Sequence, residues 1–121
     1  MNSMPTFLQI VELIKDKILL EEYLEGERIP SVREMAEMIQ VNVNTVARAF
    51  DRLQMSDIIY SQRGIGYFVQ KDAKNRIAKE LSDRFIEQTL PEVFRKMDLL
   101  KIEIQQVIQL YENRKKEDSK Y

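Results

Sequence analysis

Hydrophobic residues recur at helical spacing along most of the chain, and this pattern predicts several amphipathic helices. The first helix is expected over about residues 5–22, with Pro5 in its first turn and Ser3 as a candidate cap. Its expected role is structural, to support the elements that follow. The apolar positions of this helix are Phe7, Ile10, Val11, Ile14, Ile18 and Leu19.

Residues 29–54 have the pattern of two short helices joined by a tight turn. Pro30 favours an extended conformation at Ile29, and Ser31 and Glu34 have the spacing of a capping box. The first helix of the pair should therefore begin at Ser31. Its apolar face carries Val32, Met35, Ala36 and Ile39.

Val41 and Asn42 interrupt this periodicity, and Asn42 can cap a second helix. The second helix has a stripe typical of burial, and its remaining positions are polar. This arrangement is typical of a helix-turn-helix whose second helix enters the major groove, where Asn and Arg read base edges. An ordinary helical hairpin with a solvated polar face fits the segment equally well. The apolar stripe consists of Val46, Ala49, Phe50 and Leu53. On the opposite face lie Asn44, Arg48 and Asp51, and on the flanks lie Thr45 and Arg52.

A β-hairpin follows the helix pair. Residues 58–61 and 66–69 are β-rich, and the loop between them has a glycine on either side of Ile65. Arg63 is expected near the tip of the hairpin, and Arg28 with Ile29 should add a short strand. The order of these elements predicts a winged helix: a helix, a capped helix, a turn, a second helix and a hairpin.

Apolar residues on two further predicted helices follow Lys71 and Asp72. The first should begin near Ala73 and end near Leu90, where Pro91 can open the next helix. On the second, apolar residues alternate in steps of three and four, the a/d seam of a coiled coil over three heptads. The seam consists of Leu90, Val93, Met97, Leu100, Ile104, Val107 and Tyr111. This seam can pack on the preceding helix or form a homodimer interface. We expect the dimer to bury the apolar residues that the single chain leaves exposed.

The fold class predicted by these patterns is mainly α with a small β-hairpin. We expect a winged helix-turn-helix domain over residues 1–71, an α-helical dimerisation region over residues 72–113, and a disordered tail over residues 114–121.

Composition argues against catalysis and metal binding. The 121 residues include neither cysteine nor histidine, which removes thiolate ligands and the commonest general base. We therefore expect a protein that is not an enzyme and has no cofactor and no metal. Neither a signal peptide nor a membrane-spanning run is apparent, so we expect a cytoplasmic protein with no membrane partner.

The net charge of −1 lacks the basic excess expected of a nucleic-acid binder. Residues 1–70 hold seven basic and ten acidic residues, and residues 71–121 hold twelve and ten. Four of the seven, Arg33, Arg48, Arg52 and Arg63, lie on the helix pair and hairpin, whereas many acidic residues lie on the first helix and its exit. We expect a charge-segregated domain with weak non-specific affinity for DNA.

Several short motifs agree with one family in order and spacing. They are Phe7-x-Gln9-Ile10, Gly26-x-x-Ile29-Pro30-Ser31-x-Arg33-x-x-Ala36, Val41-Asn42-x-Asn44-Thr45-Val46-x-Arg48-Ala49-x-x-x-Leu53 and Gly64-x-Gly66-x-x-Val69. Residues 5–70 thus resemble the N-terminal domain of the GntR family of bacterial transcription regulators. The short C-terminal region resembles the YtrA subfamily, which has two helices there.

This resemblance implies that Arg33, Asn44, Thr45 and Arg48 contact operator DNA, and that Gly66 lets the wing approach the minor groove. The chain departs from the family pattern at four positions. Val43 stands where relatives often have proline, Glu22 and Glu25 replace a glycine and a proline, and Asp57 replaces a glycine before the first wing strand.

We therefore expect a homodimeric, sequence-specific transcription regulator, a repressor, that binds an inverted repeat in double-stranded DNA. Arg48 and Asn44 are the expected base readers, Ser31 and Thr45 the expected phosphate contacts, and Arg33 can reach either. Asp51 should be solvated or orient Arg48. The complete set of expected DNA-binding residues is Ser31, Arg33, Asn42, Asn44, Thr45, Arg48, Arg52, Arg63 and Gly66.

Two alternatives remain at the level of sequence. A winged helix can serve protein or RNA contacts, an alternative that the acidic composition keeps open. A small-molecule effector can also bind at the dimer seam, although no polar cluster there identifies a ligand.

Overall fold

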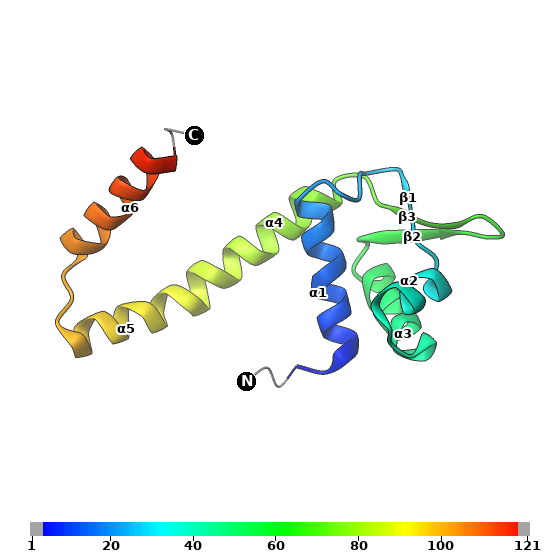
Figure 1. Ribbon diagram of the computed structural model, residues 1–121, viewed down its shortest axis with the longest axis horizontal. Coiled ribbons are helices and arrows are strands. Elements are labelled where there is room, and N and C mark those ends of the chain that lie inside the picture. Colours follow the sequence, from blue (N-terminus) through cyan, green and yellow to red (C-terminus); the bar gives the residue numbers. More distant parts are fainter. Residues whose placement is uncertain (1–3, 119–121) are drawn as a thin grey trace. The chain divides into compact units, whose positions relative to one another are not determined.

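The computed structural model describes residues 4–118 of the chain (Figure 1). They form two compact units, whose described parts are residues 4–80 and 81–118. The first unit is mainly helical with a small three-stranded sheet, and the second is helical. The predicted fold class, a winged helix-turn-helix followed by helices, is confirmed.

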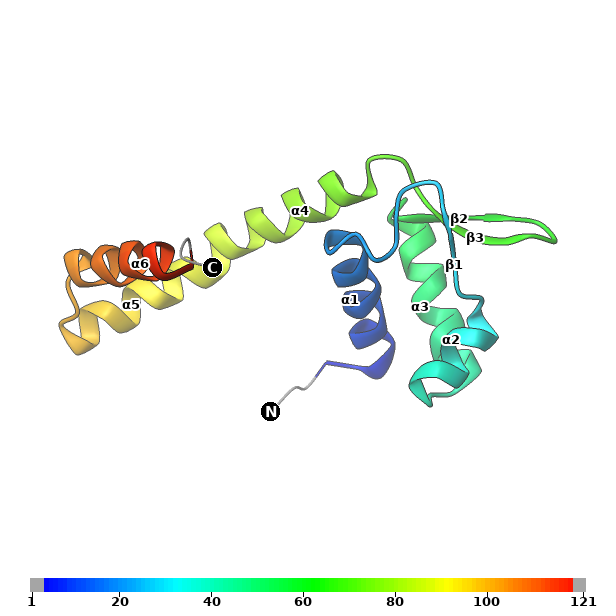
Figure 2. The same ribbon diagram turned by 45° about the horizontal axis from the view of Figure 1, so that its top comes forward.

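Three helices support the first unit: α1 (Thr6–Leu19), α2 (Val32–Ile39) and α3 (Val43–Met55). Helix α1 lies alongside α3 (Figures 1 and 2) and buries Ile10, Val11, Ile14 and Ile18. It ends before the predicted Glu22, because Glu21 takes a left-handed backbone conformation with a φ of 60°. The candidate cap Ser3 lies outside the described residues.

Helix α2 begins as its sequence predicts. The Ser31 hydroxyl accepts a hydrogen bond from the Glu34 N–H at 3.1 Å, and the Ser31 N–H donates to the Glu34 carboxylate at 2.9 Å. These reciprocal bonds are the predicted capping box. Gln40 then ends the helix with a left-handed φ of 56°, and Asn42 caps α3.

The sheet consists of β1 (Arg28–Ile29), β2 (Ile59–Gln62) and β3 (Gly66–Val69), in the order β1-β3-β2. Both pairings are antiparallel, with Ile59 opposite Val69 and Ile29 opposite Tyr67. The predicted hairpin and the short third strand are therefore confirmed. The tip of the hairpin extends beyond the helices as a wing (Figures 1 and 2).

One core joins the sheet to the helices of the first unit. Phe50 and Leu53 from α3 are fully buried, and the ring of Tyr67 meets Phe50 edge-on at 4.9 Å. Ala73 and Ile77, at the start of α4 (Ala73–Arg84), are also fully buried. In addition, the nearly buried Lys15 pairs with Glu80 at 3.3 Å. The start of α4 thus packs with the first unit, and the proposed regional boundary after residue 71 remains a sequence-based prediction.

The helical backbone does not end at Leu90, contrary to prediction. Helix α4 is followed without interruption by a π-helical turn, η1 (Phe85–Thr89), and by α5 (Leu90–Leu100). Pro91 lacks an N–H, and its ring would clash with the carbonyl of residue 87 in a regular α-helix. The wider turn accommodates the proline, since the Leu90 N–H donates to the carbonyl of Phe85, five residues back.

The prediction of one continuous helix after Pro91 is wrong, because the helix is interrupted between Leu100 and Ile104. Lys101 has a left-handed φ of 58°, and the Ile102 N–H bonds the Met97 carbonyl at 2.9 Å, as in a Schellman cap. Helix α6 (Ile104–Asp118) then begins, with the Gln106 side chain accepting from the Glu103 N–H at 3.1 Å. The predicted seam is therefore divided between α5 and α6.

Residues 114–118 are helical, whereas the sequence predicted a disordered tail from residue 114. Lys115 and Lys116 lie in the last turn of α6, where positive charge favours the helix. The charged groups of Arg114 and Lys115 also lie 5.2 and 5.0 Å from the Tyr111 ring. The remaining tail residues, 119–121, lie outside the described part.

Candidate nucleic-acid interface

Helix α3 presents one face to the core and another to solvent. Its stripe of Val46, Ala49, Phe50 and Leu53 is fully buried, as predicted. Thr45 is half-buried, and the other polar positions of the helix expected to meet DNA are exposed. These exposed positions are Asn42, Asn44, Arg48 and Arg52.

Two hollows flank α3 and bring together residues that the sequence singled out. The first lies between α2 and α3 and is lined by Arg33, Gln40, Asn42 and Val43, among others. The second lies between α3 and the start of α1, and it is lined by Pro5, Thr6, Phe7, Asn44, Thr45 and Arg48. Five of the predicted DNA-binding residues therefore line two adjacent depressions along one helix.

Asn42 and Ser31 act as helix caps in the structure. The side-chain carbonyl of Asn42 accepts from the Asn44 N–H at 2.7 Å, which leaves its amide group for an outside acceptor. Hydrogen bonding from the Ser31 backbone N–H holds the pKa of the Glu34 carboxyl below its ordinary value. An ionised Glu34 places negative charge beside the Ser31 hydroxyl, and this charge would repel a phosphate. The phosphate contact of Ser31 remains a prediction.

The wing carries Arg63, which is exposed near its tip, and Gly66, which pairs with Gln62 directly beside the loop at the tip. Gly66 has a φ of 143°, and a Cβ there would lie 2.7 Å from Nε of Arg28. Arg28 donates from Nε to the carbonyl of Ile65 at 3.2 Å, and its Nη2 lies 3.5 Å from the Glu34 carboxylate. The glycine therefore makes room for an arginine that connects the wing to the start of α2. The sequence identified Arg28 only as a strand residue.

Helix α1, the support helix, also contacts α3, the expected recognition helix, through an aromatic ring. The guanidinium carbon of Arg48 lies 3.9 Å from the centre of the Phe7 ring, and that of Arg52 lies 6.0 Å away. Sequence reasoning assigned Phe7 to the apolar face of α1 and missed this contact. The sequence signal was the position of Phe7 at the first turn of its helix, where an apolar stripe begins.

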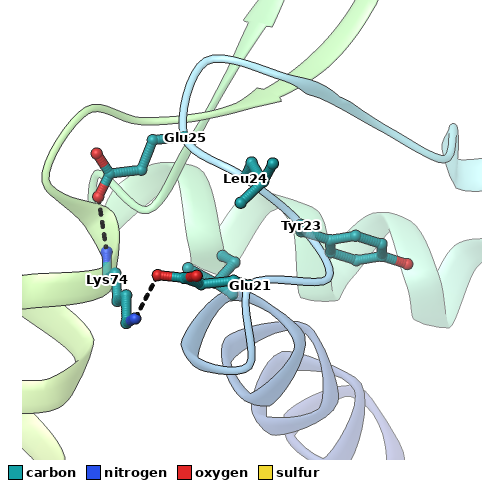
Figure 3. Close-up of a pocket in the computed structure, with 6 residues that line it drawn as sticks. Glu21, Tyr23, Leu24, Glu25 and Lys74 are labelled. Atoms are coloured by element: carbon teal, nitrogen blue, oxygen red, sulfur yellow. Dashed lines mark hydrogen bonds and ion pairs between the residues drawn. The ribbon is translucent and has the colours of Figure 1, made fainter.

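A cavity of about 310 Å³ lies near the end of α1 and is lined by Ile18, Glu21, Tyr23, Leu24, Glu25 and Lys74 (Figure 3). The Lys74 ammonium donates to Glu21 at 2.6 Å, and the Lys74 backbone N–H donates to Glu25 at 3.4 Å. The hydrogen bond from Lys74 lowers the pKa of Glu21. These contacts fasten the loop after α1 to the start of α4, and they give both carboxylates of the lining a hydrogen-bond donor from Lys74.

The predicted dimerisation residues lie on α5 and α6. Leu90 and Met97 are half-buried in the single chain, and the other five are exposed: Val93, Leu100, Ile104, Val107 and Tyr111. Helix α5 buries none of its side chains fully. The second unit thus has a large apolar surface that its described residues leave open.

Within residues 4–118, no group of three or more acidic, histidine or cysteine residues could hold a metal ion. No helix of this part is both long and apolar enough to cross a membrane.

Comparisons with known proteins agree with this geometry. Residues 6–69 match the family described as "Bacterial regulatory proteins, gntR family". The chain is 35% identical over 78 residues to the HTH-type transcriptional repressor YtrA of Bacillus subtilis, spanning 64% of this chain and 60% of that protein.

Solved structures extend the likeness to the second unit. A regulator of the GntR family from Bacteroides thetaiotaomicron is 38% identical with a TM-score of 0.79, and the match covers 94% of this chain and 99% of the other. The DNA-binding domain of AraR, solved in complex with operator ORX1, is 29% identical with a TM-score of 0.53, covering 55% and 80%.

Proposed function

The chain belongs to the GntR family of bacterial regulatory proteins, and from this premise we propose that it is a homodimeric repressor that binds an inverted-repeat DNA operator. As a transcription regulator of this family it is not an enzyme. A regulator of bacterial DNA acts in the cytoplasm, which is the location we propose.

The observation that carries the proposal is the polar face of α3. Asn44 and Arg48 are exposed on a helix whose opposite face is fixed in the core, next to a wing that carries Arg63. Arginine and asparagine make bidentate hydrogen bonds to guanine and adenine in the major groove. We therefore assign Asn44 and Arg48 to base reading, and Thr45, Arg52 and Arg63 to the backbone or groove edges. Arg33 and Asn42, which line the hollow beside α2, are assigned to the adjacent DNA strand.

Two further observations support a dimeric repressor. The apolar residues of α5 and α6 are exposed in the single chain, and burying them against a second copy would remove them from water. A symmetric dimer requires half-sites centred about 10 base pairs apart or a multiple of that distance. The repressor role rests on the similarity to the repressor YtrA. A small-molecule effector at the dimer seam remains a prediction.

Selection of bound duplexes from a random DNA pool at near-physiological salt tests the proposal. We expect an enriched inverted repeat whose spacing gives the distance between the two recognition helices. The double variant N44A/R48A should enrich no sequence, whereas Q88A/R95A, which removes an amide and a guanidinium from exposed positions of the second unit, should enrich the same repeat.

Failure of the folded protein to enrich any sequence would contradict the proposal and favour a winged helix that binds protein or RNA. The operator found would then be placed upstream of a reporter gene. Lower reporter output in the presence of the protein is expected of a repressor, and higher output would identify an activator.

A further inference from the structure

Phe7 lies where the support helix α1 meets the recognition helix α3. Its ring faces the Arg48 guanidinium, whose central carbon is 3.9 Å from the ring centre. This distance is well within the range of about 6 Å for a cation–π contact. We propose that Phe7 is a positioning residue for DNA recognition, which holds Arg48 in the orientation that the DNA contact requires. The proposal rests on the function proposed above.

Stacking on a ring orients an arginine without using its hydrogen-bond donors. The five N–H groups of a guanidinium lie in its plane, so a group that stacks on a ring keeps these donors for another acceptor. An ion pair with a carboxylate would instead occupy them. In the part of the chain that the structure describes, no carboxylate forms an ion pair with Arg48. The orienting group is therefore Phe7, and Asp51, which the sequence offered for this role, does not pair with it.

The contact also reduces the cost of binding. A free arginine side chain samples many rotamers and loses that freedom when it binds DNA. If the ring already restricts Arg48 in the unbound protein, less entropy is lost on association. Contact with α1, rather than contacts within α3, then fixes the position of a DNA-reading side chain.

The same ring also faces a second cation. Arg52 follows Arg48 by four residues on α3, so the two positive charges lie on the same side of the helix and repel each other. The Arg52 guanidinium carbon lies 6.0 Å from the centre of the Phe7 ring, at the limit of a cation–π contact. The negative face of the ring thus offsets part of this repulsion.

Phe7 differs from the core residues of its helix. Ile10 and Ile14, three and seven positions later, are buried, whereas Phe7 is only half-buried. Replacing the ring with leucine preserves an apolar side chain at the start of α1 and removes only the aromatic face. The fold should therefore survive F7L, which separates a structural role from a positioning role.

A double-mutant cycle with the selected operator tests the proposal. We expect F7L to weaken operator binding by roughly two- to fivefold, and F7Y, which keeps the ring, to bind like the wild type. In the R48A background the F7L change should have little further effect, because the group that Phe7 positions is absent. A matched control is Y23L, which removes the ring that Lys17 approaches to 5.7 Å at the other end of the support helix. Y23L should leave operator binding unchanged.

A readout in the absence of DNA checks the physical cause. The NMR order parameter of the Arg48 Nε–H bond should fall in F7L and remain high in F7Y. Equal losses from F7L in the wild-type and R48A backgrounds would overturn the proposal, as would an unchanged Arg48 order parameter or an equal loss from Y23L. If the wild type binds an operator and the cycle shows no coupling, only the role of Phe7 fails. If the wild type selects no operator, the proposed function fails, and the role of Phe7 in DNA recognition fails with it.

Discussion

Gly66 and Arg28 pack together next to the loop of the wing. The φ of 143° at Gly66 is rarely adopted by other residues, and a Cβ there would meet Arg28 Nε at 2.7 Å. Arg28 in turn bonds the Ile65 carbonyl and pairs with Glu34. A side chain at position 66 would therefore both strain the backbone and displace the arginine that connects the wing to α2.

The variant G66A should lose more stability than G64A. Gly64 also has a positive φ, of 79°, but a Cβ there would meet nothing within 4 Å, so G64A should cost about 1–2 kcal/mol from backbone strain alone. G66A should cost about 1 kcal/mol more, because the hydrogen bonds of Arg28 are lost as well. Urea unfolding of both variants measures the difference, and R28A should reduce it. An equal cost for both glycines would show that Arg28 moves aside freely.

Val43 is a residue for which the structure suggests a base contact that family resemblance does not. It occupies the first position of α3 and is 45% exposed, beside the hollow between α2 and α3. The start of a recognition helix approaches base edges, and an apolar side chain there can contact the methyl group of thymine. We therefore predict that Val43 contacts a thymine methyl group of the operator.

Replacing the thymines of the selected operator by deoxyuridine, one at a time, tests this contact. We expect one replacement in each half-site to weaken wild-type binding by about fourfold, the value of one buried methyl group. The same replacement should have no effect on V43A, while replacements elsewhere affect both proteins alike. An operator in which no thymine methyl matters would contradict a role for Val43.

Helix α2 is short and depends directly on its cap. Its eight residues include only two that are buried, so the reciprocal bonds between Ser31 and Glu34 carry much of its stability. The variant S31A should lower the free energy of unfolding by about 1 kcal/mol. S82A, at an exposed position within α4, is a suitable control because it removes a hydroxyl without removing a cap, and it should change stability little. A loss in S82A equal to that in S31A would contradict the capping role.

The same cap makes the stability depend on acid pH. Because the pKa of Glu34 is lowered in the folded protein, its contribution is present at neutral pH and is lost as the pH falls through that lowered value. The difference in stability between the wild type and E34Q should therefore shrink on acidification. Thermal unfolding at a series of pH values measures it, and a difference independent of pH would exclude Glu34 as the titrating group.

The elements that the sequence predicted well carry local signals. Ser31 with Glu34 and Asn42 mark two helix starts, and the glycines around Ile65 mark the wing. The break after α5 carries a misleading signal: Lys101 takes a left-handed conformation usually given to glycine, and the step from Leu100 to Ile104 fits an unbroken heptad. The apolar periodicity of the sequence therefore continues across a point where the helix ends.

The candidate site also has one part that the sequence predicted and one part that it did not. The exposed face of α3 was predictable, because burial of its apolar stripe fixes which side chains face solvent. The contact between Phe7 and Arg48 joins residues 41 positions apart, and that between Arg28 and Ile65 joins residues 37 apart. Such pairs follow from the packing of α1 on α3 and from the pairing of β1 with β3, which periodicity along the chain does not describe.

At the scale of the whole molecule, the charge distribution reconciles a net charge of −1 with DNA binding. Arg33, Arg48, Arg52 and Arg63 are exposed on α2, α3 and the wing, whereas Glu21, Glu22, Glu25 and Glu27 are exposed in the loop after α1. With four arginines on this surface we expect few phosphate contacts, and therefore a shallow salt dependence and weak binding to random DNA. Specific affinity must then come from base contacts and from binding two half-sites together.

The proposed joining of two half-sites would use the apolar surface of the second unit. Val93 on α5 and Val107 on α6 are 41% and 37% exposed in the single chain, among ten other large apolar residues exposed from Phe85 to Tyr111. So many exposed apolar residues are unusual for a monomer and support the proposed pairing with a second copy. A charge placed within this surface should therefore prevent dimer formation.

The variant V107E should be monomeric in sedimentation experiments at concentrations where the wild type is a dimer. The matched control Q109E adds the same charge two residues away, at an exposed polar position of α6, and should remain dimeric. V107E should also lose about a hundredfold or more in affinity for the complete operator, because its two domains no longer bind as one unit. Binding to an isolated half-site should be unchanged, since α3 and the wing are intact. If V107E stayed dimeric, the interface would have to exclude this face of α6, and if the half-site were also lost, the substitution would have damaged the fold rather than the dimer.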